Sequence, residues 1–246
     1  MKYKLGLIGK SLSHSFSRNY FSSKFQKESI SDFSYELLEV KEEELSILFN
    51  HLKQTFAGVN VTIPYKEKVL SLLDEIDIHA QNIGAVNCIA FKNGKSKGYN
   101  TDFKGFADSI KEIPFDRCKK ALILGTGGAS KATSYSLKTF FNVESDFVSR
   151  NPQIGFEYEA ISDEMMHNYG IIVNTTPLGM HPNIKSFPPI NYNFITSQHF
   201  CVDLIYNPEE TLFMKKCKER GALVKNGLEM LENQAELSFL IWKNNL

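Results

Sequence analysis

The stretch ALILGTGGASKATSYSL, residues 121–137, is the part of the sequence that says most about the fold. An apolar run predicts a short buried strand, a glycine-rich turn follows at 125–128, and a pattern with helical spacing comes next. Gly125 permits a sharp turn, Gly127 lets the backbone approach a pyrophosphate without a Cβ atom in the way, and the amide groups that open the helix offer an anion site. The candidate dinucleotide-binding residues in this turn are Gly125, Thr126, Gly127, Gly128 and Ala129. Ser130 stands where a third glycine or alanine is usual, so the motif alone also fits an ordinary glycine-rich turn.

The strand after this turn indicates which dinucleotide is bound. It ends in FVSRN, residues 147–151, and offers Ser149 and Arg150 where an NAD-binding unit presents an acidic residue to the ribose hydroxyls. A guanidinium group can pair with a 2′-phosphate, which a carboxylate would repel. We therefore predict NADP as the cofactor, with a solvated loop charge as the alternative interpretation of Arg150.

Short apolar runs alternate with longer amphipathic ones along the chain, which is typical of α/β proteins. The runs predict strands at 4–8, 34–39, 58–63, 85–92, 95–99, 120–124, 146–149, 171–174 and 200–204. Helices are expected at 17–27, 42–52, 68–74, 102–113, 129–140 and 228–242. A second strand–helix cycle begins near Thr101. We expect two domains with a cleft between them: a substrate-binding α/β domain, residues 1–101, on which the C-terminal helix 227–246 packs, and a Rossmann-like dinucleotide-binding domain, residues 102–226.

Composition excludes several classes of function. Lys and Arg together number 28 among the 246 residues, as do Asp and Glu, whereas a protein whose main partner is nucleic acid or an anionic membrane needs a basic surface. The four cysteines are widely spaced and lack nearby paired histidines, so we expect no metal site and a reduced, cytoplasmic protein. No apolar run approaches the length of a membrane span or of a signal-peptide core.

Three polar clusters follow predicted strands in the first half of the chain. They are GKSLSHSFS at 9–17, NVTIPYK at 60–66, and GAVN at 84–87 followed by YNTD at 99–102. In an open α/β sheet, ligands bind beyond the carboxyl ends of the strands. Hydroxyls, amides, one ammonium and one carboxylate suit a small polyhydroxylated acid, although each cluster taken singly fits caps and turns.

Taken in order, these motifs resemble the shikimate dehydrogenase family over essentially the whole chain. GKSLSHSFS is similar to the family's G-x-P-x-x-H-S-x-S opening, and NVTIPYK to N-V-T-x-P-x-K. GAVN, NTD, the glycine loop GTGGAS and the ending GLEMLENQA have counterparts in the same sequence order. The resemblance implies reversible, NADPH-dependent reduction of 3-dehydroshikimate to shikimate in aromatic amino acid biosynthesis.

The resemblance also implies roles for particular residues. Lys66 and Asp102 would form the catalytic pair, and Gly227 and Leu204 would lie at the nicotinamide. The substrate-binding set would be Ser15, Ser17, Asn60, Thr62, Lys66, Asn87, Asp102, Tyr206 and Gln234. The chain departs from the family pattern at Ser11 and Arg18, where prolines are frequent, and at Ile154, where a second basic residue often stands. We expect His14 to be a structural hydrogen-bonding residue.

Three other functions remain open at the level of sequence. A quinate/shikimate dehydrogenase that accepts NAD has the same fold, and a folate-linked dehydrogenase has a similar one, although the hydroxyl cluster fits a carbocyclic acid better than a pterin. A non-catalytic dinucleotide or shikimate sensor is expected to lack the lysine–aspartate pair, and both Lys66 and Asp102 are present here. The sequence is compatible with a monomer or a homodimer.

Overall fold

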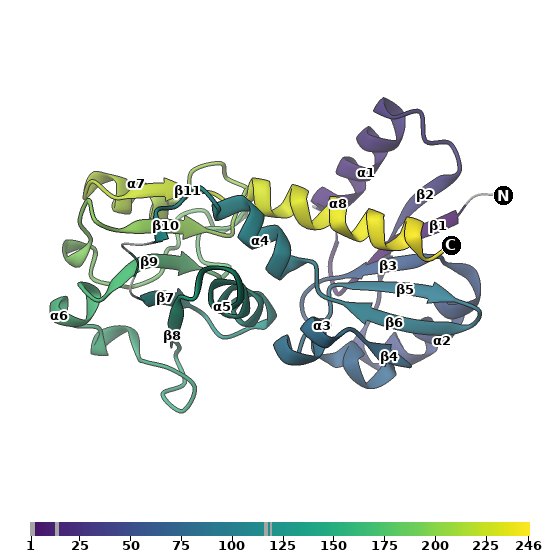
Figure 1. Cartoon of the computed structure of the whole chain (residues 1–246), viewed down its shortest axis with the longest axis horizontal. Helices are drawn as coiled ribbons and strands as arrows, with labels where there is room; N and C mark the ends of the chain where they lie inside the picture. Colours follow the sequence, from purple (N-terminus) through teal and green to yellow (C-terminus); the bar gives the residue numbers. More distant parts are fainter. Residues whose placement is uncertain (1–2, 13–14, 116–117, 119) are drawn as a thin grey trace. The chain divides into compact units, whose positions relative to one another are not determined.

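The computed structural model describes residues 3–12, 15–115, 118 and 120–246, so the prediction for His14 lies outside the described residues. The chain forms two compact units. Unit 1 comprises Met1–Thr101 and Gln234–Leu246, and unit 2 comprises Asp102–Asn233. The last helix, α8 (Leu228–Asn244), is continuous in Figure 1, and the division between the units falls within it.

Unit 1 contains a mixed six-stranded sheet in the order β2-β1-β3-β5-β6-β4. Its strands are β1 (Tyr3–Gly9), β2 (Phe33–Glu39), β3 (Gly58–Val61), β4 (Glu75–Ile76), β5 (Cys88–Lys92) and β6 (Lys95–Tyr99). β1 pairs in parallel with β2 and β3, whereas β5 runs antiparallel to β3 and β6. The hairpin predicted at Asn93-Gly94 is confirmed, since both residues have the positive φ that such a turn requires.

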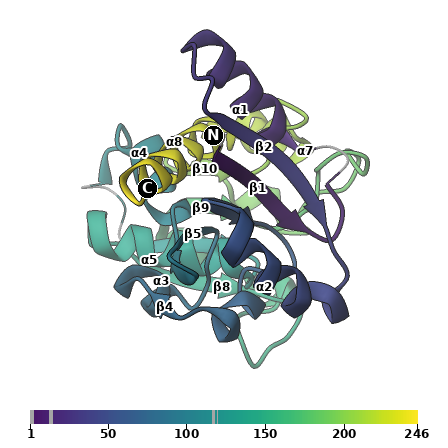
Figure 2. The same ribbon diagram turned by 90° about the vertical axis from the view of Figure 1, so that its right-hand side faces the viewer.

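Helices cover both faces of the unit 1 sheet, as Figure 2 shows. They are α1 (Phe16–Lys27), α2 (Leu45–Thr55), α3 (Ile78–Ile83) and the 3₁₀ helices η1 (Glu42–Glu44) and η2 (Lys68–Leu72). One apolar cluster joins α2, η2 and α3 to the sheet, and a second, rich in aromatic rings, joins α1 and the end of α8 to it. In the second cluster the indole N–H of Trp242 donates to the Ile89 carbonyl over 2.9 Å. A Cβ atom on Gly58 would lie 2.1 Å from the Trp242 ring, so this close packing requires glycine there.

Unit 2 contains a five-stranded sheet in the order β11-β10-β9-β7-β8, and every pairing is parallel. The strands are β7 (Lys120–Leu124), β8 (Glu144–Val148), β9 (Tyr169–Asn174), β10 (Phe200–Asp203) and β11 (Leu223–Lys225). β7 pairs with β8 on one side and with β9 on the other. The order in which the chain adds strands therefore reverses at β7. The carboxyl ends of strands at such a reversal are where doubly wound sheets bind ligands.

Two apolar clusters cover the two faces of the unit 2 sheet. α4 (Asp102–Ile110), α5 (Gly128–Phe141) and the first turn of α8 contribute to one cluster. The other cluster contains residues of α6 (Asp163–Met166) and α7 (Leu212–Glu219). The 3₁₀ helices η4 (Tyr158–Ala160) and η5 (Tyr192–Phe194) lie in the connections. The predicted α/β class with a Rossmann-like second half is therefore confirmed.

Several local expectations need correction. Residues 68–74, expected as a helix, form only the 3₁₀ helix η2, and the helix expected to reach residue 113 ends at Ile110. β4, β11, α3, α6 and α7 were not expected. All of them except α7 are too short to show a clear hydrophobic period. Helix α7 carries Phe213, Met214 and Cys217 at helical spacing after the N-cap Thr211 and was predictable from the sequence.

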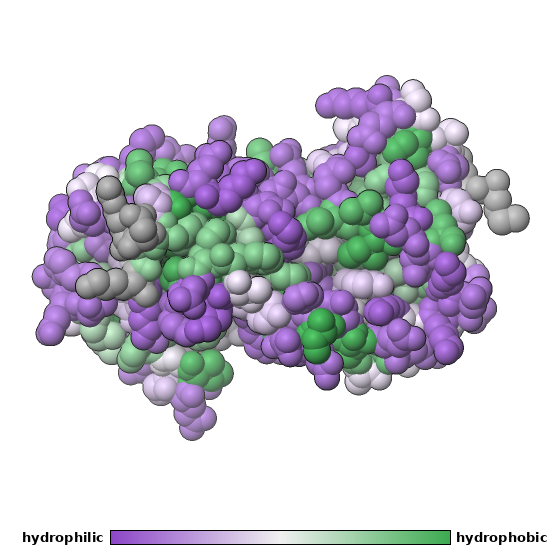
Figure 3. All heavy atoms as spheres, in the orientation of Figure 1, coloured by the Kyte–Doolittle hydropathy of each residue, from purple (hydrophilic) through white to green (hydrophobic). Residues whose placement is uncertain are grey.

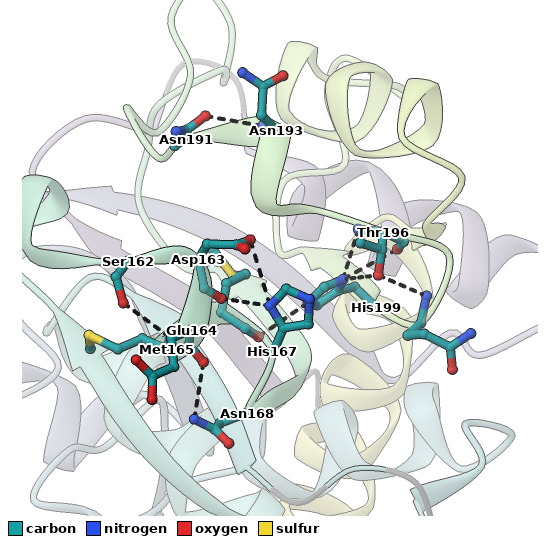
Figure 4. A network of polar contacts seen from close by, with 12 residues as sticks. Ser162, Asp163, Glu164, Met165, His167, Asn168, Asn191, Asn193, Thr196 and His199 are labelled. Carbon is teal, nitrogen blue, oxygen red and sulfur yellow. Dashed lines mark hydrogen bonds and ion pairs between the residues drawn. The ribbon is translucent and has the colours of Figure 1, made fainter.

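His199 links the connection before β10 to the last residue of α6 (Figure 4). Its Nδ1 lies 2.9 Å from the Thr196 backbone nitrogen, which can only donate, so Nδ1 is the acceptor and Nε2 carries the proton. The Nε2–H group faces the Met166 carbonyl at 3.3 Å. His199 is 3% exposed, so water cannot easily replace these partners.

We expect the substitution His199→Leu to destabilise the protein by about 1–3 kcal/mol, because it leaves a buried donor and a buried acceptor unsatisfied. Urea denaturation measures the change in unfolding free energy. The matched control is His167→Leu, which removes an exposed imidazole from the same group of contacts. Equal unfolding free energies for the two variants would contradict the role given to His199.

The surface visible in Figure 3 carries mostly hydrophilic residues with smaller apolar areas between them. Within the described residues, no helix has both the length and the apolar character that crossing a membrane demands. All four cysteines are free thiols.

Candidate active site

A buried amide network lies at one end of the unit 1 sheet. Asn60 on β3 and Asn87 just before β5 are 5% and 2% exposed. The Asn87 amide donates to the Thr101 hydroxyl at 2.9 Å and to Gln234 Oε1 at 3.4 Å, and its oxygen accepts from the Thr101 backbone N–H at 2.6 Å. Asn60 in turn donates to the Asn87 carbonyl at 3.1 Å. The network thus brings together three of the predicted substrate residues: Asn60, Asn87 and Gln234.

The hydrogen-bonding capacity of Asn60 is almost fully used within unit 1. Its second N–H donates to the Ser238 hydroxyl at 2.9 Å, and its oxygen accepts from the Tyr35 hydroxyl at 2.9 Å. In this arrangement only one lone pair of the Asn60 oxygen is left for a ligand. Tyr35 is half-buried; desolvation raises its pKa, while its hydrogen bond with Ser17 acts to lower it. Asn60 and Tyr35 therefore hold neighbouring side chains in place.

Ser15, Ser17, Thr62 and Lys66 are half-buried and border this end of unit 1. Ser15 is the N-cap of α1, yet its hydroxyl caps no backbone group and has no hydrogen-bond partner among the described residues. A buried hydroxyl without a partner is costly, so this atom suits an external acceptor such as a carboxylate. Lys66 lies two residues after Pro64. The Lys66 carbonyl accepts from the Val86 N–H at 2.8 Å, and this bond fixes the Lys66 backbone beside the GAVN segment.

In unit 2, the glycine turn follows β7 at the point where the strand order reverses. Gly125 has φ +114°, and a Cβ atom on it would lie 2.7 Å from Thr175 Oγ1, so glycine is required there. Apart from its chain neighbours, no residue that the structure describes comes within 4 Å of the Cβ position of Gly127. Helix α5 begins at Gly128, and its N-cap residue Gly127 makes no side-chain cap. Thr126 lies in the turn and Ala129 in the first turn of α5, and both are half-buried.

Ser149 and Arg150 follow β8, the strand next to the glycine turn. Ser149 is 8% exposed, and its hydroxyl accepts from Asn151 N–H at 3.0 Å, which makes a compact turn. Arg150 is exposed, and its charge acts to lower the pKa of nearby Tyr158, although burial raises that pKa more strongly. Ile154 in the same loop is 56% exposed. Arg150 thus presents a cation at the carboxyl end of β8.

Leu204, Tyr206 and Gly227 lie beyond the carboxyl end of β10. The Gly227 N–H donates to the Ile205 carbonyl at 3.1 Å, and a Cβ atom on Gly227 would lie 2.1 Å from the Leu204 carbonyl oxygen. The segments before α8 and after β10 are therefore in direct contact. Asp102, the first residue of α4, is 6% exposed and stands where a helix N-terminus favours negative charge.

Each unit thus provides a candidate binding site of its own. Unit 1 offers hydroxyls, amides and the Lys66 ammonium, which can bind and polarise an oxygenated ring. Unit 2 offers a turn whose backbone a diphosphate can approach, with a cation at the next strand.

Comparison with known proteins identifies the family. Residues 7–89 match the model of the shikimate dehydrogenase substrate binding domain. The NADP⁺-dependent shikimate dehydrogenase of Carboxydothermus hydrogenoformans is 39% identical over 253 residues, which cover 96% of this chain and 90% of that protein. The chain belongs to the shikimate dehydrogenase family.

Other members of the family agree with this assignment. The NADP⁺-dependent enzyme of Caldanaerobacter subterraneus subsp. tengcongensis is 37% identical, with 96% of this chain and 90% of that protein covered. The solved structure of shikimate 5-dehydrogenase from Thermus thermophilus, in complex with NADP(H) and shikimate, has a TM-score of 0.89 and 30% identity, with 99% of this chain and 94% of that chain covered.

One departure from the usual dinucleotide-binding turn has a local explanation. The hydroxyl of Ser130, which replaces the third glycine or alanine, lies 2.6 Å from Thr175 Oγ1, and Thr175 in turn donates to the Leu124 carbonyl at 2.7 Å. The serine therefore links the start of α5 to the turn after β9.

Sequence reasoning missed Tyr35, Ser238 and Asp203. Ser238 carried a signal, because it lies four residues after Gln234 on one helix face. Asp203 carried another, as an acidic residue at the end of an apolar strand. Tyr35 resembles an ordinary strand residue, and nothing in its local sequence marks it.

Proposed function

We propose that this chain is an NADP-dependent shikimate dehydrogenase, which reversibly reduces 3-dehydroshikimate to shikimate in aromatic amino acid biosynthesis. The observation that carries the proposal is the unit 1 site. This site contains the Ser15 hydroxyl, which has no hydrogen-bond partner in the described part of the chain, half-buried Thr62 and Lys66, and the Asn60–Asn87–Gln234 network. All of these lie within or beside the segment that matches the family's substrate-binding domain. Ser15 and Ser17 would hold the substrate carboxylate, while Thr62, Asn87, Gln234, Asp102 and Tyr206 would contact ring hydroxyls.

The proposal assigns residues 1–101 with the C-terminal helix to the substrate and residues 102–226 to NADP. The residues of unit 2 suit a dinucleotide, because Gly127 has open space at its Cβ position and no side chain caps the start of α5. Gly125, Thr126, Gly127, Gly128 and Ala129 would hold the diphosphate, and Ser149 and Arg150 the 2′-phosphate. Leu204 and Gly227 would contact the nicotinamide, which supplies the hydride when it is bound.

In the reduction, the substrate ketone oxygen gains negative charge and needs a proton. Lys66 would stabilise that oxygen as an ammonium and donate the proton from Nζ. Asp102 would accept a hydrogen bond from the substrate hydroxyl and orient Lys66. Asn60, whose amide hydrogens are already bonded, would keep Asn87 and Tyr35 in position rather than bind with its N–H groups.

The partners in this proposal are small molecules only, with neither nucleic acid nor membrane. Four free cysteines support a reducing compartment, and we propose the cytoplasm. Gel filtration with light scattering distinguishes a monomer from a homodimer by mass.

The proposal is tested by following NADPH absorbance with shikimate, quinate or no substrate, using NADP⁺ and NAD⁺ in turn. We expect turnover with shikimate and NADP⁺ to exceed every other combination. Comparable rates with quinate and NAD⁺ would instead identify a quinate/shikimate dehydrogenase. Binding of shikimate and NADP⁺ without turnover would identify a sensor and refute the proposal.

Arg150→Ala is expected to raise the KM for NADP⁺ by about 10–100-fold, because charge-assisted hydrogen bonds to a phosphate contribute about 1.5–3 kcal/mol. The KM for NAD⁺ should change little, since NAD⁺ lacks the 2′-phosphate. Steady-state kinetics with both cofactors measures the two values. Arg220→Ala, which removes another exposed arginine of unit 2, is the matched control and should leave both unchanged. Equal effects of Arg150→Ala on both cofactors would remove Arg150 from 2′-phosphate recognition.

A further inference from the structure

Asp203, the last residue of β10, is completely buried and binds three donors through its carboxylate. Oδ1 accepts from the Asn174 side chain at 3.1 Å and from the Ile205 backbone N–H at 3.0 Å. Oδ2 accepts from the Thr211 hydroxyl at 2.6 Å. The proposed reaction does not use this carboxylate, although buried carboxylates are rare unless they are paired.

The three donors belong to three different segments at the carboxyl end of the unit 2 sheet. Asn174 ends the adjacent strand β9, and its oxygen accepts from both the backbone and the hydroxyl of Thr176, which fixes the turn after β9. Thr211 is the N-cap of α7 and accepts from Met214 N–H at 3.3 Å. Ile205 lies in the loop after β10, and its carbonyl accepts from Gly227.

One carboxylate therefore determines the relative positions of the turn after β9, the loop 204–211 and the Gly227 segment. Leu204 and Gly227, the residues assigned to the nicotinamide, lie on two of these segments and touch each other. Leu204 is also held by Asn174, whose carbonyl accepts its N–H at 3.0 Å. The carboxylate itself is 0% exposed and cannot contact a ligand.

We propose that Asp203 is a positioning residue for the nicotinamide end of the cofactor, acting through Asn174, Ile205 and Thr211 without touching NADP. This inference rests on the proposed function, because it takes Leu204 and Gly227 as cofactor contacts.

The ionised form of Asp203 does not stabilise the folded protein. Burial raises the pKa of Asp203 to about 6, and the bonds from Thr211, Ile205 and Asn174 act to lower it. A carboxyl whose folded-state pKa exceeds the unfolded value adds stability when protonated, and that contribution is lost as pH rises through about 6. At neutral pH the ionised form thus costs folding stability, so removing the charge need not unfold the protein.

Few other titratable groups face Asp203. Asn174 on β9 and Thr211 beside α7 are uncharged. Burial raises the pKa of Tyr192 on η5, and the nearby Cys217, Cys201 and Asp203 raise it further. Tyr192 therefore stays neutral. Lys225 on β11, the strand next to β10, forms an ion pair with Glu229 at 2.5 Å. Asp203 is therefore the group expected to titrate here near pH 6.

The test compares the wild-type enzyme with Asp203→Asn and with the pair Thr211→Val and Thr211→Ser. Calorimetric titration with NADP⁺ gives its dissociation constant, and steady-state kinetics gives the KM for NADP⁺ and for shikimate. We expect Asp203→Asn and Thr211→Val to weaken NADP⁺ binding about tenfold or more, the effect of losing one charge-assisted hydrogen bond. Thr211→Ser keeps the hydroxyl and should bind NADP⁺ normally. The KM for shikimate should change less than the affinity for NADP⁺, because most of the proposed substrate contacts lie in unit 1.

The pH dependence provides a readout that a purely structural role would not affect. As pH falls below about 6, wild-type affinity for NADP⁺ should decline more steeply than that of Asp203→Asn, because protonation of Asp203 adds to protonation of the 2′-phosphate, which affects both proteins alike. Asp146→Asn is the control, since the Asp146 carboxylate also accepts from a hydroxyl, that of Tyr169, and pairs with Lys120, and these two partners open β9 and β7 at the amino ends of the strands. This variant should lower the melting temperature and leave NADP⁺ binding unchanged.

Normal NADP⁺ affinity in both Asp203→Asn and Thr211→Val would overturn the inference. An equal loss in Thr211→Ser and Thr211→Val would do the same, because the hydroxyl would then be irrelevant. If Asp203→Asn fails to fold, the threonine pair decides. If the wild-type chain binds NADP⁺ but does not oxidise shikimate, the proposed function fails, while the binding data still test Asp203.

Discussion

Replacing Lys66 by alanine is expected to lower kcat at least about 100-fold, which corresponds to about 2.7 kcal/mol of lost transition-state stabilisation. The reason is that the ammonium group supplies both the charge and the proton that the forming alkoxide needs. The KM for shikimate should change little, since the hydroxyl and amide groups that hold the ring remain. Initial rates over a range of shikimate concentrations separate the two effects.

The control for this experiment is Lys68→Ala. Lys68 lies two residues further along, is exposed, and forms a surface ion pair with Glu42. Its loss should leave kcat unchanged, because exposed ion pairs contribute little. Near-normal turnover of Lys66→Ala would remove Lys66 from the mechanism.

Asp102→Asn is expected to be the second severely impaired variant, with kcat lowered by about 100-fold or more. The amide keeps the size of the side chain but removes the negative charge that would orient Lys66 and the substrate hydroxyl. Single-turnover measurements of NADPH formation test the effect on the chemical step without interference from product release.

Asp108→Asn is the matched variant for this prediction. Asp108 lies on the same helix, α4, is half-buried, and pairs with Lys104 at 2.5 Å. The Asp108→Asn variant should form NADPH at the same rate as the wild type. If Asp102→Asn turned over shikimate as fast as Asp108→Asn, Asp102 would be a binding contact or a helix-capping residue only.

The sequence predicts most of the sheet scaffold because the central strands are continuous apolar runs. Leu122, Ile123 and Leu124 are completely buried, as a parallel strand covered on both faces requires. The glycine turn is equally local, since the positive φ of Gly125 follows from a chain that must turn sharply between strand and helix. The three-residue strand β11 could not be predicted, because it exists only through its pairing with β10.

The candidate site was predictable as a set of residues but not as a network. Local sequence suggests that Asn60 and Asn87 are polar groups after strands, and it does not reveal that Asn60 donates its N–H groups to Ser238 and the Asn87 carbonyl. Ser238 is 178 residues away in the chain from Asn60, and its contact depends on how α8 packs on the sheet. Long-range packing therefore decides which amides remain available to a ligand.

The course of α8 has a consequence for biosynthesis of the chain. Unit 1 requires residues Gln234–Leu246, which leave the ribosome after unit 2, although the other residues of unit 1 are made before unit 2. Until then Phe21, Phe25 and Phe33 lack the covering rings of Phe239 and Trp242. Unit 1 is thus begun before unit 2 and completed after it, and a nascent chain truncated before residue 234 would expose an aromatic surface prone to aggregation.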